Sequence, residues 1–421
     1  MRKCTKLINK IFAVIFITSF VIISGFHTII AATLPTFAVV ENSNNTSSYI
    51  TSESSVQTVA PPSFNFASGA QILMEQSTGN IIYANNENER LLPASVTKVM
   101  TLLLIMEAID NGKLALTDKV TCSAYASKMG GSQIWFKEGE QLTIEEAIKC
   151  ICIVSANDVS TAMAELIGGS EENFVNLMNE KAASLGMENT HFMNAHGIDE
   201  ENHYSSAKDI AIMSRELVTK HPNILKYTSI WMDSIRGGTF TLSNTNKLLK
   251  SYSGITGLKT GSTSAAGFNL TATATKNNMS LIAVVLKAPS SEIRNNEITQ
   301  MLNYGFSNFQ TKTYAKARDV IQSIQLEKHV TENVNIYYEK EVTQMLEKGT
   351  SSDLTQELVL NESLRAPLKN GDTVGTVIFK NSDGSENTRV NAIVTNDISR
   401  SSLMDYLRHV FNTYLLVYAK G

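Results

Sequence analysis

The stretch from Ser95 to Asp110 constrains the fold of this chain more than any other. Its apolar content is nearly continuous, with Val99, Met100 and residues 102–106 all apolar. A helix that is apolar on every side must also be covered on every side. We therefore expect this helix in the middle of a domain.

Strand patterns flank that helix in the sequence. Residues 69–86 predict two strands around a turn, and strand patterns return between residues 257 and 289. Helical patterns fill the interval, and one of them begins at Thr143, which forms a candidate capping box with Glu146. This order predicts an α+β domain over residues 67–310, with one sheet assembled from both ends and helices packed on it.

The chain begins with the layout of a secretory signal peptide. Three lysines precede an apolar run, and small residues follow it. We expect the signal peptide over residues 1–38. An uncleaved membrane anchor is the alternative, because the run approaches the roughly 20 residues that span a bilayer. Residues 39–66, rich in Ser, Asn and Thr, predict a flexible linker, and with either reading the protein is exported.

The C-terminal part differs in composition. Short β-rich runs with turns predict a small separate all-β domain over residues 311–396. In the last segment, residues 397–421, apolar and aromatic residues including Leu403, Leu407 and Phe411 share one helical face. We expect an amphipathic helix that attaches the protein peripherally to the outer face of the cytoplasmic membrane and does not span it. A helix docked on the protein's own core is the alternative.

Charge and cysteine usage narrow the function classes. The formal net charge of −4 gives no electrostatic case for nucleic-acid binding. Cys150 and Cys152 stand two apart in a predicted helix, so they point to nearly opposite faces, cannot pair with each other and are expected in the core. A disulfide bridge from Cys122 to Cys150 or Cys152 is the alternative. The histidines between residues 191 and 203 suit turn or packing roles better than metal binding, and we predict no metal and no other cofactor.

A serine–lysine pair opens the apolar helix. Ser95 and Lys98 match the pattern Ser-x-x-Lys, which also occurs by chance, and Ser205 with Lys208 is a second match. Context separates the two pairs, because only the first is followed in order by Ser-x-Asn at 155–157 and by Lys-Thr-Gly at 259–261. The three motifs in this order form the active-site signature of penicillin-recognising serine enzymes.

The first pair suits acyl transfer. At positions i and i+3 of a helix, Ser95 and Lys98 lie within reach of a hydrogen bond. A serine hydroxyl becomes a strong nucleophile only when a base removes its proton, and a lysine can be that base only when it is neutral. Burial and a second cation, which Lys259 could supply, both depress a lysine pKa. The start of the helix also directs backbone N–H groups at developing negative charge.

The other motif residues fit supporting roles. Ser155 could pass a proton between the base and the leaving group, and Asn157 could hold a substrate amide. The alternative is that both residues simply close helices or turns. Lys259 and Thr260 suit a ligand carboxylate, while Gly261 would leave room for the substrate backbone beside its strand.

Beyond these motifs, the chain resembles the low-molecular-mass penicillin-binding proteins, specifically the exported serine-type D-alanyl-D-alanine carboxypeptidases. The resemblance rests on residues 77–101, 189–217, 254–275 and 301–309, within a segment that runs from about Ala67 to Phe309. It implies a β-lactamase/transpeptidase-like domain, with an antiparallel sheet, packed helices and an inserted helical region. The β-rich segment and the terminal helix match the family's domain order more loosely.

The resemblance also implies roles and a reaction. Its residues would be the acylated nucleophile Ser95, the general base Lys98, the proton relay Ser155, the substrate-orienting Asn157, the carboxylate-binding Lys259 and Thr260, and the oxyanion-hole N–H groups of Ser95 and Ser262. Arg294 would be a further carboxylate-binding residue, with a solvated surface arginine as the alternative.

The enzyme would remove the last D-alanine from peptidoglycan pentapeptide stems through an acyl-enzyme that water hydrolyses. β-Lactams would trap the same serine, and the second pair at Ser205 would be structural.

Three other functions compete with this one. A class A β-lactamase needs a Glu-x-x-Leu-Asn sequence after Ser-x-Asn, and Glu188 lacks the Leu-Asn. A transpeptidase or D,D-endopeptidase of the same superfamily would use the same site residues. A non-catalytic peptidoglycan-binding protein is disfavoured by the complete set of motif residues.

Overall fold

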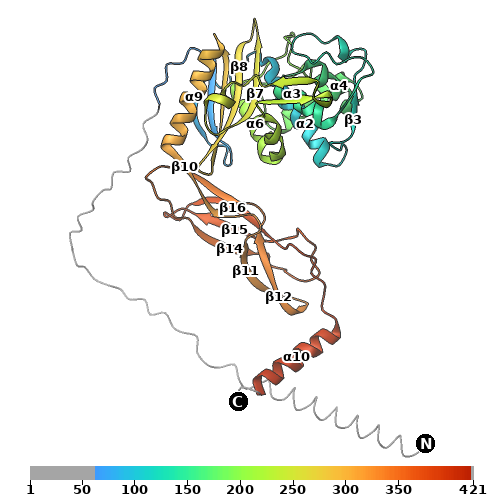
Figure 1. The fold of residues 1–421 in the computed structure, drawn as a ribbon. Helices are drawn as coiled ribbons and strands as arrows, with labels where there is room; N and C mark the ends of the chain where they lie inside the picture. Colours follow the sequence, from blue (N-terminus) through green and yellow to red (C-terminus); the bar gives the residue numbers. More distant parts are fainter. Residues whose placement is uncertain (1–61, 419–421) are drawn as a thin grey trace, which may run out of the picture. The chain divides into compact units, whose positions relative to one another are not determined.

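The computed structural model describes residues 62–418 (Figure 1). The expected signal peptide and most of the expected linker lie outside the described residues, as do residues 419–421. The side chains of Thr331 and of residues 413–418 are likewise not described.

An antiparallel sheet of five strands forms the centre of the N-terminal part. Its strand order is β2-β1-β9-β8-β7, so strands from both ends of the segment meet in one sheet. This confirms the predicted sheet. The strands are β1 (Ala70–Glu75), β2 (Ile81–Asn85), β7 (Ile255–Thr263), β8 (Gly267–Lys276) and β9 (Met279–Ala288).

Helices cover both faces of this sheet. Alternate residues of β9 point to opposite faces, so Val284 belongs to one core and Val285 to the other. Helix α9 (Ser291–Asn308) packs on the second core through Ile298 and Met301. The larger first core holds the remaining main helices, and Figure 1 shows α9 on one side of the sheet with α2, α3 and α6 on the other.

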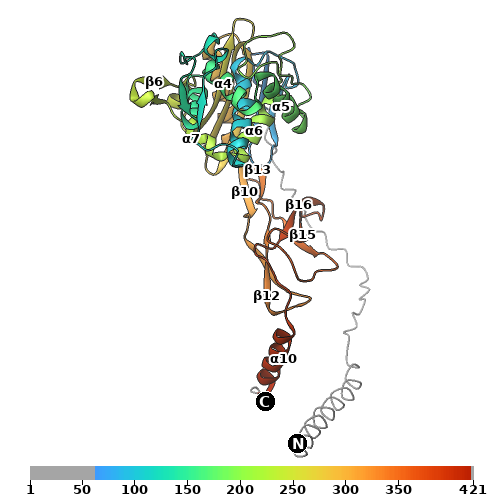
Figure 2. The same cartoon turned by 90° about the vertical axis from the view of Figure 1, so that its right-hand side faces the viewer.

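The inserted region between β2 and β7 is mostly helical. Figure 2 shows α4, α5 and α6 gathered in this region and β6 at its periphery. Its elements are η1 (Ala94–Thr97), α2 (Lys98–Asp110), β3 (Lys119–Thr121), η2 (Ala126–Lys128), β4 (Gln141–Thr143), α3 (Ile144–Ile153), α4 (Asn157–Gly168), α5 (Glu171–Ser184), α6 (Ala207–Lys220), η3 (Pro222–Ile224), α7 (Leu225–Thr228), β5 (Met232–Ile235), η4 (Arg236–Gly238), β6 (Phe240–Ser243) and α8 (Leu248–Ser251).

Two local predictions for this region are confirmed. Helix α2 is buried on every side, and Leu102, Leu103 and Ile105 have no exposed surface. Helix α3 begins with the predicted capping box, in which Thr143 Oγ1 accepts from Glu146 N at 3.1 Å and Glu146 Oε2 accepts from Thr143 N at 3.0 Å.

The packed chain begins slightly earlier than expected. Phe64 and Phe66, assigned to the flexible linker, stack at 4.5 Å between ring centroids, and Phe64 meets Tyr83 and Tyr304 edge to face. Glu297 of α9 accepts a hydrogen bond from Ala67 N at 2.7 Å. Two aromatic rings two residues apart in an extended segment lie on the same side, so together they cover apolar surface beside the sheet.

A separate all-β part follows α9, as predicted. Five antiparallel strands are ordered β11-β12-β16-β15-β14, and β10 pairs with β13. Its own core contains Ile336, Val377 and Phe379. The strands are β10 (Phe309–Ala315), β11 (Val320–Leu326), β12 (His329–Tyr338), β13 (Val342–Glu347), β14 (Thr355–Leu360), β15 (Thr373–Lys380) and β16 (Glu386–Ile393).

The predicted terminal helix is present as α10 (Leu403–Tyr418). Its apolar side chains are exposed over the described part, from 56% for Leu407 to 77% for Leu403. Within residues 62–418, no helix has both the length and the hydropathy that crossing a bilayer requires.

The cysteines behave as small core residues. Cys122, Cys150 and Cys152 are all buried and unbridged. The bridge from Cys122 is therefore not formed in this structure.

Candidate active site

The first serine–lysine pair lies where a short 3-10 turn runs into α2. Ser95 belongs to η1 and Lys98 begins α2, and the two side chains approach to 3.0 Å between Oγ and Nζ. The second pair is not arranged in this way, because Ser205 Oγ hydrogen-bonds to Thr190 Oγ1 at 2.8 Å.

Lys98 is completely buried and surrounded by acceptors. Its Nζ donates to Asn157 Oδ1 at 2.7 Å and to the carbonyl oxygen of His196 at 2.5 Å. Burial lowers the pKa of Lys98 well below its usual value, and the charge of Lys259 lowers it further, while Asp158 opposes the shift.

This geometry sets the direction of the proton between Ser95 and Lys98. A neutral amine has two N–H donors and one lone pair. The carbonyl oxygen of His196 and the amide oxygen of Asn157 can only accept, so they take both N–H groups. The lone pair of Lys98 is then left for the hydroxyl proton of Ser95.

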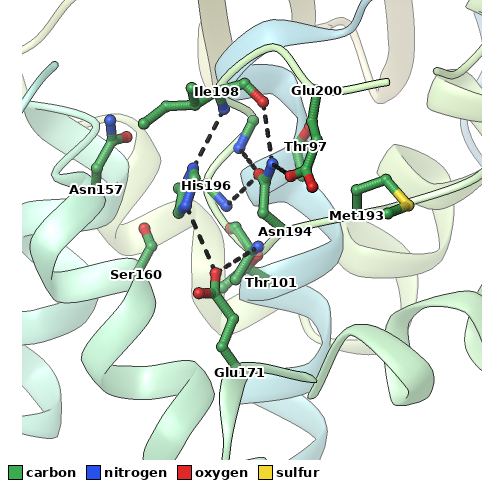
Figure 3. A network of polar contacts seen from close by, with 12 residues as sticks. Thr97, Thr101, Asn157, Ser160, Glu171, Met193, Asn194, His196, Ile198 and Glu200 are labelled. Carbon is green, nitrogen blue, oxygen red and sulfur yellow. Dashed lines mark hydrogen bonds and ion pairs between the residues drawn. The ribbon is translucent and has the colours of Figure 1, made fainter. Parts of the chain in front are cut away.

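The carbonyl group of His196 that accepts from Lys98 belongs to a tight turn at residues 194–198, and Figure 3 shows the polar contacts around Asn194 and His196 in this turn. His196 Nδ1 accepts from Ile198 N at 3.2 Å, and burial lowers the pKa of His196 to about 3, so this ring is neutral. Gly197, at φ +85°, lies so near the start of the helix that a Cβ there would stand 1.9 Å from Ala94 O. The histidine thus has the expected turn and packing role, and its carbonyl is part of the site.

Ser155 lies at the end of α3 in an unusual conformation. Its φ is +63°, a left-handed value that non-glycine residues rarely adopt. Its side chain is buried, and Oγ has no hydrogen-bond partner within the part of the chain that the structure describes. A strained residue with a free buried hydroxyl, two positions before the Asn157 that contacts Lys98, is typical of a functional position.

Asn157 connects Lys98 to a neighbouring loop. Its Oδ1 accepts from Lys98, its Nδ2 donates to Gly130 O at 2.7 Å, and its backbone N–H donates to Ser132 O at 2.7 Å. Both ends of the carboxamide are therefore engaged by the protein. In the structure the side chain positions Lys98, and the substrate amide that the sequence suggested as a partner stays a prediction.

Strand β7 brings the third motif to the same place. Lys259 is buried, and its Nζ donates to Thr260 O at 2.9 Å. Burial lowers the pKa of Lys259 to about 7, with a further contribution from Arg294. A Cβ on Gly261 would stand 2.9 Å from Pro93 O, Ser95 N and Val96 N. The glycine therefore allows β7 to approach η1, and the substrate clearance that the sequence suggested stays a prediction.

The remaining predicted residues flank this strand. Ser262 follows on β7 and is exposed. Arg294 lies on α9 and is buried, with Nη1 donating to Asn269 O at 3.3 Å. It is therefore not the solvated surface arginine that was the alternative. Burial lowers the pKa of Arg294 to about 10. Its positive charge in turn contributes to the lowered pKa of Lys259.

The sequence did not point to Thr245. Its Oγ1 lies 2.6 Å from Thr260 Oγ1, and its backbone N–H donates to Ile153 O at 3.1 Å. Buried Asn246 donates from Nδ2 to Gly257 O at 3.0 Å and so fixes the turn to β7. No short motif marks this turn, and only the fold shows that it joins the end of α3 to the lysine-bearing strand.

Asp158 was also missed, although it follows a motif directly. It is buried, and one oxygen, Oδ2, accepts from Ile134 N and from Phe136 N at 3.0 Å each. Desolvation raises the pKa of this carboxyl, opposed by these backbone hydrogen bonds. The residue shapes the loop that Asn157 contacts.

Comparisons with known proteins agree with this geometry. A family model described as D-alanyl-D-alanine carboxypeptidase matches residues 55–290, and one described as the C-terminal domain of penicillin-binding protein 5 matches residues 309–400. The D-alanyl-D-alanine carboxypeptidase DacF of Bacillus subtilis is 41% identical over 82% of this chain and 89% of its own length.

Solved structures show the same relationship. Penicillin-binding protein 5 of Haemophilus influenzae is 32% identical, with a TM-score of 0.65 over 81% of this chain and 100% of that chain. Penicillin-binding protein D2 of Listeria monocytogenes, solved in a cefotaxime-bound form, is 29% identical, with a TM-score of 0.54 over 58% of this chain and 99% of that chain. The chain therefore belongs to the D-alanyl-D-alanine carboxypeptidase family, the serine hydrolases of the penicillin-binding type.

Proposed function

We propose that Ser95 is the nucleophile with which this protein removes the terminal D-alanine from peptidoglycan pentapeptide stems. Neutral Lys98 takes the hydroxyl proton as Ser95 Oγ attacks the carbonyl carbon of the penultimate D-alanine. The tetrahedral oxyanion lies between the backbone N–H groups of Ser95 and Ser262. The contact of 3.0 Å between Lys98 Nζ and Ser95 Oγ, with both other Nζ partners restricted to accepting, is the observation that carries this assignment.

Ser155 relays the proton to the leaving group. Collapse of the tetrahedral intermediate breaks the peptide bond, and the departing D-alanine nitrogen needs a proton. The hydroxyl of Ser155, which has no partner among the described residues, can accept from protonated Lys98 and donate to that nitrogen. Asn157 keeps Lys98 in place during both transfers.

The free carboxylate of the substrate is bound by the cationic side of the site. Lys259 and Arg294 supply positive charge and Thr260 supplies a hydroxyl donor. Water then hydrolyses the ester on Ser95 and releases the shortened stem. A β-lactam carries a comparable carboxylate and acylates the same serine, in keeping with the antibiotic-bound form of the Listeria relative.

Peptide hydrolysis and penicillin labelling test the assignment together. Purified protein should release D-alanine from a peptide ending in D-Ala-D-Ala, and Ser95→Ala should abolish both the release and covalent labelling by a fluorescent penicillin. Ser205→Ala, at the second Ser-x-x-Lys match, is the control and should keep both. Mass analysis should find the penicillin on the peptide that contains Ser95. Full activity of the Ser95→Ala protein would rule out the mechanism.

Export and peripheral membrane attachment complete the proposal. The N-terminal sequence supports export, and the exposed apolar side chains of Leu403, Leu407 and Phe411 on α10 support attachment to a lipid surface. Deleting residues 399–421 should move the protein from the membrane fraction to the soluble fraction and leave its activity on small peptides intact. An unchanged distribution would contradict attachment through this helix.

A further inference from the structure

We propose that Trp135 and Phe240 form a platform that binds a sugar ring of the glycan strand to which the peptide stem is attached. The inference rests on the proposed function and extends its substrate from the peptide to the polymer that carries it. Trp135 is 66% exposed, more than any other large hydrophobic side chain described in the N-terminal part.

The exposure of Trp135 is built into the loop. Ile134 and Phe136 on either side are buried, and both of their backbone N–H groups donate to the single oxygen Oδ2 of buried Asp158. Trp135 between them has φ +54°, a strained value for an aromatic residue. A buried carboxylate thus fixes both neighbours inward and turns the tryptophan outward. Strain held by such a network is typical of functional positions.

A second segment completes the platform. The ring of Phe240, at the start of β6, meets Trp135 at 6.1 Å between centroids and an interplanar angle of 71°. Arg236 holds the two segments together, because its guanidinium lies 5.2 Å from the Phe240 ring, donates to Ile134 O at 3.0 Å and pairs with Glu140 at 2.6 Å. The aromatic pair is therefore held in place before any ligand arrives.

The platform is linked to Ser95 through a short series of contacts. Ser132 O accepts the backbone N–H of Asn157, whose side chain contacts Lys98. Trp135 is three positions after Ser132 in the sequence, so the two residues are at most about 11 Å apart. An extended pentapeptide spans about 17 Å, so the sugar-bearing end of a stem whose last residues lie at Ser95 is well away from the reacting atoms, and we place it at Trp135.

The surroundings favour a sugar over an apolar partner. The residues that follow Trp135 on the exposed loop include Lys137, Glu138 and Gly139, so the aromatic surface is small and bordered by charge. A membrane or a protein interface needs a larger continuous apolar area. A pyranose ring offers apolar C–H groups for the aromatic face and hydroxyls for the polar border.

Matched substrates test the proposal. Wild type and Trp135→Ala should hydrolyse a soluble pentapeptide ending in D-Ala-D-Ala with the same kcat/KM. On the same pentapeptide linked to a glycan chain, Trp135→Ala should lose about tenfold in kcat/KM, mostly through KM. Trp135→Phe should recover most of the loss, and Trp231→Phe, at the other tryptophan, should match wild type on both substrates.

Equal losses on both substrates, or no loss on the glycan-linked one, would overturn the platform. Failure of wild type to hydrolyse the soluble peptide would instead overturn the proposed function. Loss of self-association or vesicle binding in Trp135→Ala, with glycan-linked hydrolysis unchanged, would assign the aromatic pair to another partner and also overturn it.

Fluorescence gives a second readout that does not depend on catalysis. The chain has two tryptophans, so Trp231→Phe leaves Trp135 as the sole reporter. A β-1,4-linked N-acetylglucosamine tetramer should change the emission of this variant in a saturable way. No change at millimolar tetramer would contradict sugar binding at Trp135.

Discussion

We expect Thr245 to be a positioning residue, because its side chain contacts the hydroxyl of Thr260, the proposed donor to the substrate carboxylate. When Thr245 donates to Thr260 across their 2.6 Å contact, the proton of Thr260 is free for a substrate carboxylate, and the two hydrogen bonds strengthen each other. We expect Thr245→Val to raise KM for a soluble peptide roughly three- to tenfold with little change in kcat, as for the loss of a hydrogen bond of about 1 kcal/mol. Thr245→Ser should restore KM. A fall in kcat at constant KM would contradict the arrangement.

Two buried lysines make the acid side of the pH profile informative. Lys259, whose pKa burial lowers to about 7, carries its charge mainly below that pH. That charge opposes protonation of Lys98 and keeps its base form available at lower pH. Removing it in Lys259→Gln raises the pKa of Lys98, so the acid limb of penicillin acylation should move to higher pH. Lys208→Gln should leave the limb in place, and a shift to lower pH would contradict the coupling.

At the scale of elements, the contact of β7 with η1 assembles the site. A Cβ on Gly261 would meet three backbone atoms of residues 93–96 at 2.9 Å, and backbone cannot rotate away as a side chain does. Gly261→Ala should therefore displace the strand and reduce acylation by about 100-fold, as for a misplacement of about 1 Å. Gly112→Ala, remote from the site at φ +70°, should cost stability of about 1 kcal/mol and leave acylation intact. Similar acylation rates in the two variants would argue against this contact.

The elements also show what the sequence could predict. The strands, the apolar helix and the capping box at Thr143 follow from local patterns, and the three motifs predicted which segments converge. The turn around Thr245, the carbonyl of His196 on Lys98 and the clearance at Gly197 depend on contacts between distant segments. A hydrogen bond from Lys98 to a backbone carbonyl does not depend on the type of residue that supplies the carbonyl, so no sequence motif indicates it. Asp158 is the residue that sequence reasoning could have found. A carboxyl group next to a motif in an apolar helix is expected to be buried, and a buried carboxyl group needs hydrogen-bond partners.

For the whole molecule, the proposed membrane attachment would rest on apolar contact rather than on charge. The chain has a formal net charge of −4, and the described part of α10 carries both Asp405 and Arg408. In the proposed attachment, electrostatic attraction to anionic lipid would be weak, and insertion of the apolar face would have to supply the binding free energy. Binding of protein lacking residues 1–38 to neutral lipid vesicles should therefore change little between low and high salt, since screening acts on charges.

Point variants in the full chain separate the two ends that could hold the protein at the membrane. Leu407→Glu combined with Phe411→Glu places two charges on the exposed apolar face of α10 and leaves the rest of the sequence unchanged. If the leader is cleaved, this double variant should fractionate as soluble protein and keep wild-type hydrolysis of small peptides. Arg408→Glu, on the polar face, is the matched control and should stay with the membrane. A double variant that remains membrane-bound with its N-terminal segment intact would show that the leader serves as the anchor and that α10 is dispensable for attachment.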